Sequence, residues 1–389
     1  MAARKSLPRQ AGFTLVELMV ALVLGLILTS GVISVYITSK NTYNVNNGLG
    51  AVQEHGRFAF SFMDPQVRMA GYHGCARKQS PRNNSGTGAD PVYDYTTGVY
   101  GYEAAGTGIG DSLTLDEATA STVLGDPASW TPALDTGGAG TLYATIKPYI
   151  VADSDVFMVR ELAGAPYPLV GTFDDGATLF VSTTDKAADG VTDVNDAEFF
   201  SVGEIAMVAS CGQQPQVFTV AAVDTGAGTI TYDSLGGLKF DSGGNVGAAL
   251  TYAYYVGRGV DNGPALYQAY LKSDGTLETK ELVSGIENMQ VLYGVGDGGD
   301  VPVTINFQTA DTVDAGGLWS RVVSIRVALI ARSDDNAVEK APDDAPVFHM
   351  LASDPVADKN GDGFQLTLPQ DRRLRRYFVQ TFSVRNALP

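Results

Sequence analysis

Basic residues are scarce in this sequence of 389 residues. Lys and Arg together number 26 against 43 Asp and Glu, so the formal net charge is -17. Electrostatic attraction to nucleic acid or to an anionic lipid surface is therefore not expected of the body as a whole. Charged residues of both signs make up only 18% of the chain and hydrophobic residues 44%. This composition excludes a disordered chain and indicates a mostly globular protein.

Histidine and recognisable catalytic motifs are also lacking. The chain has three histidines, and although His73 and Cys75 could supply two metal ligands, no second pair stands at zinc-finger spacing. The Gly-rich strings that begin at Gly106 and Gly294 lack the lysine of a P-loop, so we interpret them as turns. No nucleophile motif is present either. The sequence therefore predicts that the protein is not an enzyme.

The N-terminus, in contrast, carries a long run without charge. Leu18 to Ile37 holds 20 uncharged residues, and a helix of that length spans about 30 Å, the thickness of one hydrocarbon core. Arg4, Lys5 and Arg9 precede this run and the rest of the chain is acidic. The positive-inside rule then leaves residues 1–12 in the cytoplasm and exports the large body. No ordinary secretory cleavage site follows, so we expect the helix to be retained.

One acidic residue, Glu17, stands at the edge of this apolar run. An acid inside a membrane is costly and usually has a specific partner. At headgroup depth, however, the cost is small and no partner is needed. The residues alone leave both interpretations open.

An amphipathic pattern continues beyond the membrane segment. Apolar residues recur at helical spacing, at Val45, Leu49, Val52, Ala59, Met63 and Val67. We therefore expect the helix to extend outward and to place this apolar face on the globular body. Asp64 and Pro65 interrupt the pattern, and their order is typical of an N-cap followed by proline at the first helical position. A kink and a restart of the helix are expected there.

The remainder of the chain is predicted to be rich in β-strands. Gly numbers 45 and aromatic residues are plentiful, which favours many short strands joined by Gly-containing turns. The candidate strands are 155–160, 178–182, 204–209, 216–223, 229–232, 250–256, 265–271, 289–293, 301–307, 322–331 and 377–384. Helical patterns between them are scarce, so we expect antiparallel sheets packed on the N-terminal helix, an α+β fold.

The string from Gly12 to Glu17, GFTLVE, follows a short basic leader and precedes the apolar helix. It closely resembles the class III signal of type IV pilins and pseudopilins. The resemblance implies that a membrane-bound prepilin peptidase cuts after Gly12 and that the new N-terminus, Phe13, is methylated. It also implies that Glu17 pairs with the terminal amine of a neighbouring subunit, because a carboxylate and an ammonium cancel each other's cost in a dry bundle.

Several downstream strings resemble the PilW family of minor pilins. These strings lie between Gly56 and Cys75, around Cys211, after Gly285, after Trp319 and in the last 20 residues. The resemblance implies a leader at 1–12, a transmembrane and assembly helix at 13–37, an amphipathic continuation at 38–73, and a periplasmic β-rich domain at 74–389. The Gly-, Ser- and Thr-rich stretch at about 78–142 is the least recognisable, and we interpret it as a variable loop region.

The two cysteines, Cys75 and Cys211, belong to the exported part of the chain. In an oxidising periplasm an even pair favours a disulfide, the alternative being two buried free thiols. Such a bridge would tie the end of the helix to a central strand.

Two further clusters leave alternatives open. Asp358, Asn360 and Asp362 match the oxygen ligands that begin a calcium loop. The twelfth position, however, is Pro369 and not Glu. The cluster therefore predicts either a calcium site or an Asx-rich hairpin turn, and no other cofactor is expected.

A basic stretch near the end of the chain holds Arg372, Arg373, Arg375 and Arg376. It could contact DNA or an acidic partner pilin, and pairing with neighbouring carboxylates is the interpretation that we favour.

Three functions are compatible with these observations. The first is a minor pilin that primes pilus assembly and joins the tip complex with other minor pilins, the major pilin, a tip adhesin and the inner-membrane assembly platform. It would reside in the inner membrane and then in the pilus, and would support twitching motility and adhesion. The second is a pseudopilin of type II secretion. The third is a tip-located module that binds a surface, a glycan or DNA.

Overall fold

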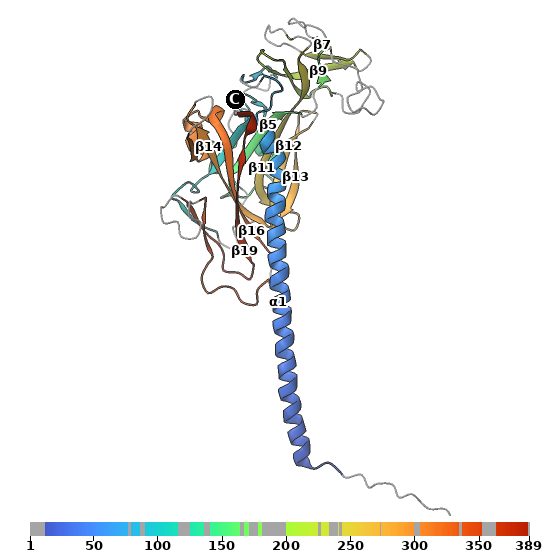
Figure 1. The fold of residues 1–389 in the computed structure, drawn as a ribbon, viewed down its shortest axis with the longest axis vertical. Coiled ribbons are helices and arrows are strands. Elements are labelled where there is room, and N and C mark those ends of the chain that lie inside the picture. The colour runs from blue at the N-terminus through green and yellow to red at the C-terminus, as the bar shows by residue number, and fades with distance from the viewer. Residues whose placement is uncertain are drawn as a thin grey trace, which may run out of the picture.

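The structure is a computed structural model of the chain. It describes residues 12–76, 79–85, 90–115, 125–135, 141–163, 167–170, 178–180, 200–224, 227–232, 240, 243–272, 274–298, 304–333, 337–351 and 363–387. One long helix leaves a β-rich body and extends far beyond it (Figure 1). The expected α+β fold, with the helix packed on antiparallel sheets, is confirmed.

The helix α1 runs from Leu15 to Met69 as one element of 55 residues. The predicted restart of the helix at Asp64 and Pro65 is wrong, because α1 continues through Pro65 without a new N-cap. Pro65 lacks an N–H and so removes one i→i−4 backbone hydrogen bond from α1, and only four helical residues follow it. Asp64 accepts a hydrogen bond from Arg68 Nε at 2.6 Å, one turn further along, and does not cap a second helix.

The larger sheet has twelve strands and consists of one path with additional pairings at its sides. Its path runs β4 (Trp130–Thr131), β2 (Val99–Ala104), β5 (Val156–Leu162), β11 (Asn245–Arg258), β8 (Ile205–Ala209), β9 (Gln216–Asp224), β10 (Thr229–Tyr232) and β7 (Thr178–Phe180). The side pairings involve β1 (Arg82–Asn83), β6 (Tyr167–Pro168), β12 (Pro264–Leu271) and β13 (Leu277–Ser284). All pairs are antiparallel except the short pair β1–β9.

The long strand β11 holds the two halves of this sheet together. Its first residues, 245–248, pair with β8, and its later residues, 252–258, pair with β12 on the same side. On the other side β5 pairs with residues 249–254. The strands β8, β9, β10 and β7 form a lobe, called the β7–β10 lobe below, which β11 attaches to the part of the sheet that faces α1. This lobe lies at the end of the molecule farthest from the start of α1 (Figure 1).

Two smaller sheets complete the body. The first has four strands in the order β15 (Ile305–Gln308), β14 (Ile286–Gly296), β16 (Val322–Arg332) and β19 (Arg375–Ser383). The second joins β17 (Val347–Met350), β18 (Phe364–Thr367) and β3 (Ser112–Thr114). Short helices occupy the connections: α2 (Thr141–Ile146), α3 (Ala310–Ala315), η1 (Pro91–Tyr93), η2 (Pro127–Ser129), η4 (Trp319–Arg321) and η5 (Arg385–Ala387).

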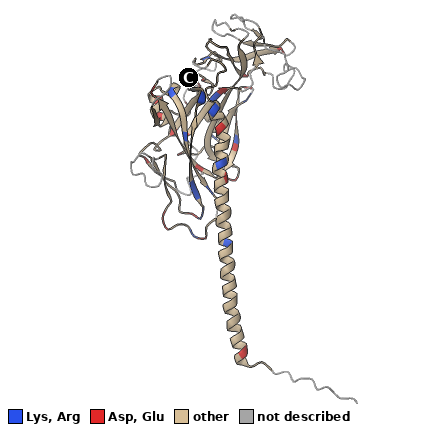
Figure 2. Cartoon of the chain, viewed as in Figure 1, with Lys and Arg blue, Asp and Glu red and all other residues tan. Residues whose placement is uncertain are grey.

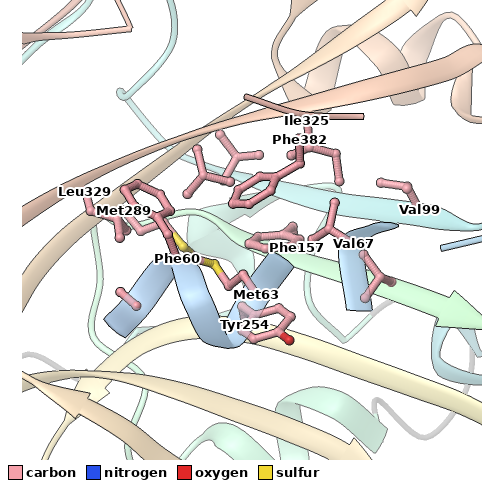
Figure 3. Packing of buried hydrophobic residues seen from close by; sticks show 14 of the residues in the cluster. Phe60, Met63, Val67, Val99, Phe157, Tyr254, Met289, Ile325, Leu329 and Phe382 are labelled. Carbon is pink, nitrogen blue, oxygen red and sulfur yellow. The ribbon is translucent and has the colours of Figure 1, made fainter. Parts of the chain in front are cut away.

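The second half of α1 packs between the large sheet and the four-stranded sheet. Phe60, Met63 and Val67 are buried in one core with Phe157 and Phe382 (Figure 3). The rings of Phe60 and Phe382 have centroids 6.0 Å apart. Burying each large apolar side chain contributes about 1.5–3 kcal/mol, so this face fixes the direction of the whole helix.

Two glycines take part in this packing. A Cβ atom at Gly56 would lie 2.7 Å from three ring atoms of Phe378, and one at Gly48 would lie 2.9 Å from Ala337 Cβ. The predicted apolar face is confirmed at Val52, Ala59, Met63 and Val67, but Leu49 is 39% exposed. Gly48 is buried instead, although the hydrophobic pattern predicted that its larger neighbour Leu49 would be the buried residue.

The stretch at about 78–142 contributes more to the fold than loops. It supplies β2 to the large sheet, and Tyr95, Tyr102 and Trp130 are buried in a second core. The interpretation as a loop region therefore holds only for part of the stretch. Of the predicted strand 301–307, residues 305–307 belong to β15, and residues 301–303 lie outside the described residues.

Candidate processing and assembly helix

The residues just before α1 are non-helical and exposed. Gly12, Phe13 and Thr14 lie outside the helix, and Phe13 is 89% exposed. A Cβ atom at Gly12 would meet no atom within 4 Å. The bond between Gly12 and Phe13 therefore stands in an open, non-helical segment, which is the form that a peptidase can bind.

Thr14 and Glu17 form a capping box at the start of α1. Glu17 N–H donates to Thr14 Oγ1 at 3.3 Å, while the N–H and the hydroxyl of Thr14 both donate to Glu17 Oε2 at 3.0 Å. The pattern Thr-x-x-Glu is a sequence signature of a helix N-terminus. Neither of the two interpretations of Glu17 drawn from the sequence included this capping role, although the Thr-x-x-Glu pattern is visible in the sequence.

The first half of α1 has the length and composition of a membrane span. The helix contains an 18-residue window with a mean hydropathy of 2.5, none of which is buried by the described body. Between Glu17 and Lys40 it has no charged residue, which Figure 2 shows as a long tan stretch. The hydroxyls of Thr29 and Thr38 donate to carbonyls one turn earlier, at Gly25 and Ser34, at 2.8 and 2.9 Å. Their polar groups are thus satisfied within the helix, as a lipid environment requires.

Cys75 and Cys211 form a disulfide, with their Cα atoms 5.0 Å apart. The bridge joins the segment just after α1 to the end of β8, as the sequence predicted. His73, beside this bridge, is buried, with 9% of its surface exposed. The segment after α1 lies along β5, where Gly71 N–H donates to Arg160 O and Leu162 N–H donates to Tyr72 O. Burial lowers the pKa of His73 to about 4.

The basic stretch divides into paired and unpaired arginines. Arg375 donates to Glu287 Oε2 at 2.6 Å and to Asp371 Oδ1 at 2.6 Å, and Arg373 donates to Asp371 Oδ2 at 2.8 Å. These bonds hold the pKa of Asp371 low, at about 2. Pairing with carboxylates is therefore confirmed for Arg373 and Arg375. Arg372 and Arg376 are exposed and have no carboxylate partner among the described residues.

Two buried carboxyls, Glu103 and Asp155, lie at the junction of the two main sheets. Thr107 Oγ1 is 3.5 Å from Glu103 Oε1 and 3.5 Å from Asp155 Oδ1. Their other partners are backbone N–H groups, and Asp155 accepts from Ala104 and Val291 at 2.9 and 2.8 Å. Burial, with the repulsion of the neighbouring carboxyl, raises the pKa of Glu103, and burial raises the pKa of Asp155.

The candidate calcium ligands Asp358, Asn360 and Asp362 lie outside the described residues. Within the part of the chain that is described, no group of three or more His, Cys, Asp and Glu side chains could hold a metal ion.

The N-terminal sequence carries a prepilin methylation motif. Residues 7–33 match the family described as prokaryotic N-terminal methylation motif. The chain is therefore a pilin-like protein with a methylation motif ahead of its hydrophobic helix. Residues 253–386, from within β11 to η5, match type IV pilus-assembly protein W. The resemblance to the PilW family that the strings after Gly285, after Trp319 and in the last 20 residues predicted is confirmed over these residues.

A solved structure of a type IV-like pilin from Thermus thermophilus is similar to this chain. It has 17% sequence identity and a TM-score of 0.23, and the match covers 49% of this chain and 87% of that chain. No curated protein matches the chain.

Proposed function

We propose that this protein is a minor pilin that primes assembly of a type IV pilus and joins its tip complex. Its partners are other minor pilins, the major pilin, a tip adhesin and the inner-membrane assembly platform, and a prepilin peptidase processes it. It resides in the inner membrane with its body in the periplasm and then in the pilus at the cell surface, where it supports twitching motility and adhesion. The observation that carries this proposal is the PilW match over residues 253–386.

The exposed apolar half of α1 supports a role in assembly. Leu22, Leu26 and Val32 are each at least 60% exposed, and this much apolar surface is stable only in lipid or against other apolar helices. A helix of this kind can move from the membrane into a helical bundle of pilins. The body lies entirely at the other end of α1 (Figure 1), so it does not obstruct such a bundle.

The β7–β10 lobe supports a position near the tip. It extends beyond the end of α1, away from the membrane half (Figure 1). A subunit with nothing above it has room for such an extension, whereas a subunit in the middle of a filament has further subunits above it.

Processing is tested by mass spectrometry of the assembled protein. We expect a methylated Phe13 as the N-terminus, and a bulky residue in place of Gly12 should leave the precursor uncleaved because the peptidase needs a small residue before the cut. An intact Met1 on protein in pili would contradict this step.

The decisive experiment is deletion of the protein, with surface pili and secreted enzymes scored in the same strain. Loss of pili with normal secretion is the expected result. Normal pili with lost secretion would replace the proposed function by that of a type II secretion pseudopilin, and normal pili with normal secretion would remove the priming role.

A further inference from the structure

The strand β19 forms one edge of the four-stranded sheet. It pairs with β16 over nine residues, from Arg375 to Ser383, without a break in register. Among the described residues, no strand pairs with its other side. The sheet therefore ends on a long, regular strand that lies beside α1 (Figure 1).

The backbone hydrogen bonds show which residues face the unpaired side. Ser333 N–H donates to Leu374 O at 2.8 Å, and Val384 N–H donates to Val323 O at 2.9 Å. Hydrogen-bonded positions alternate along an antiparallel strand, so the even-numbered residues of β19 bond to β16. The odd-numbered residues, Tyr377, Val379, Thr381 and Ser383, direct their backbone N–H and C=O groups to the unpaired side.

This edge lacks the features that usually prevent pairing with another chain. Proteins protect edge strands with proline, bulges or charged side chains. From Tyr377 to Ser383 the strand has no proline and no charge, its register has no bulge, and Val379 is 48% exposed. An unprotected edge of this length is a template for an added strand.

A hollow of about 660 Å³ lies between this strand and α1. It is lined by Gly50, Gln53, Glu54 and Arg57 of α1 and by Arg376 and Phe378 of β19. Arg57 and Arg376 have no carboxylate partner among the described residues. With two arginines against one glutamate, the hollow favours an acidic side chain.

We propose that an extended segment of another pilus protein adds to β19 as a fifth strand and places an acidic side chain in this hollow. Its backbone would bond to Val379 and Thr381, and its carboxylate would lie between Arg57 and Arg376. The proposal rests on the proposed function, which supplies the class of partner. It identifies the surface through which the globular body, and not only the helix, joins the assembly.

The test is photo-crosslinking in cells that produce the full chain together with the other pilins of the same pilus. A benzoylphenylalanine at Thr381 is expected to attach to an extended, acid-containing segment of one of those proteins. Val379→Pro removes the N–H that faces the unpaired side and should lower the yield of this adduct about tenfold or more. Val379→Ala is the matched control, because it removes the same side chain but keeps the N–H, and it should leave the yield unchanged.

The charge of the hollow is tested in the same way. Arg376→Glu should lower the adduct yield several-fold, whereas Arg372→Glu, an exposed arginine of the same basic stretch outside the hollow, should not. Membrane levels and resistance to proteolysis of each variant serve as the control for folding.

Three outcomes would overturn the proposal: an adduct that survives Val379→Pro, an adduct only with helical segments of the partner, or an adduct only with a second copy of this chain. Counting pili distinguishes a failure of the strand-addition proposal from a failure of the proposed function. If deletion abolishes pili but the Val379→Pro strain has normal pili and a normal adduct, only the strand addition is wrong. If deletion leaves pili normal, the proposed function itself is wrong.

Discussion

The close packing of α1 against β19 depends on the absence of a side chain at Gly56. A Cβ atom there would lie 2.7 Å from three ring atoms of Phe378. Overpacking of a filled core costs about 1–3 kcal/mol, whereas Ala in place of Gly within a helix gains about 1 kcal/mol. For Gly56→Ala we therefore expect a change in the free energy of unfolding between about zero and a loss of about 2 kcal/mol.

Gly50→Ala is the matched control, since it is the same substitution in the same helix. A Cβ atom at Gly50 would meet no atom within 4 Å, so only the gain in helix propensity remains. This variant should be about 1 kcal/mol more stable than the wild type. The difference between the two variants isolates the packing cost of about 1–3 kcal/mol.

The measurement is urea unfolding of the full chain in detergent, followed by tryptophan fluorescence. Trp319 is buried in the same core as Phe60 and Met63 of α1, so its emission reports on the relevant packing. With a slope of about 3 kcal/mol per molar urea, a difference of 2 kcal/mol moves the midpoint by about 0.7 M.

A double-mutant cycle with Phe378→Ala identifies the contact itself. When the ring is absent, Gly56→Ala should stabilise as much as Gly50→Ala does, which gives a coupling energy of about 1–3 kcal/mol. Equal stabilisation by both glycine substitutions in the wild-type background would refute the reasoning, because the helix would then not be seated against Phe378.

Three further predictions concern the body. Replacing Cys75 and Cys211 by serine should cost about 2–4 kcal/mol of stability, because the bridge closes a sequence separation of 136 residues; equal urea midpoints would contradict this. Burial raises the pKa of Glu103 above its unfolded value, so the folded state holds more protons and stability should fall as pH rises from 7 to 9; Glu103→Gln should flatten that dependence in unfolding titrations. Glu287→Gln removes the carboxylate that Arg375 shares with Arg332, while Asp371 still neutralises Arg375, and it should cost about 1.5–3 kcal/mol, measured as a lower melting temperature.

The sequence predicted the helix and most strands because their patterns are local. An uncharged run of 20 residues indicates a membrane span, and β-branched and aromatic runs such as 322–331 indicate strands. The strand β13 was missed because Glu278, Lys280 and Glu281 give it a polar composition. Its position beside β12 and α1 is set by tertiary pairing and not by its own residues.

The packing of α1 could be predicted only in part from the sequence, and the reason is physical. Hydrophobic periodicity finds the positions where a side chain is buried, as at Val52 and Met63. It cannot find positions where two elements approach so closely that no side chain fits. Gly48 and Gly56 are eight residues apart on the buried face, and only knowledge of the surface beneath them distinguishes them from the exposed Gly50.

The capping box changes what the acid at position 17 implies. Both hydrogen bonds from Thr14 end on Glu17 Oε2, so the other carboxylate oxygen has no described partner and remains available to the ammonium of a neighbouring subunit. The local role and the proposed assembly role therefore use different oxygens of one carboxylate, and they do not compete. They differ in their need for charge, because glutamine also fits the third helical position of a capping box. Glu17→Gln should keep the helix start and membrane insertion but lose co-purification with other pilins, whereas normal piliation at normal membrane levels would leave Glu17 with the capping role alone.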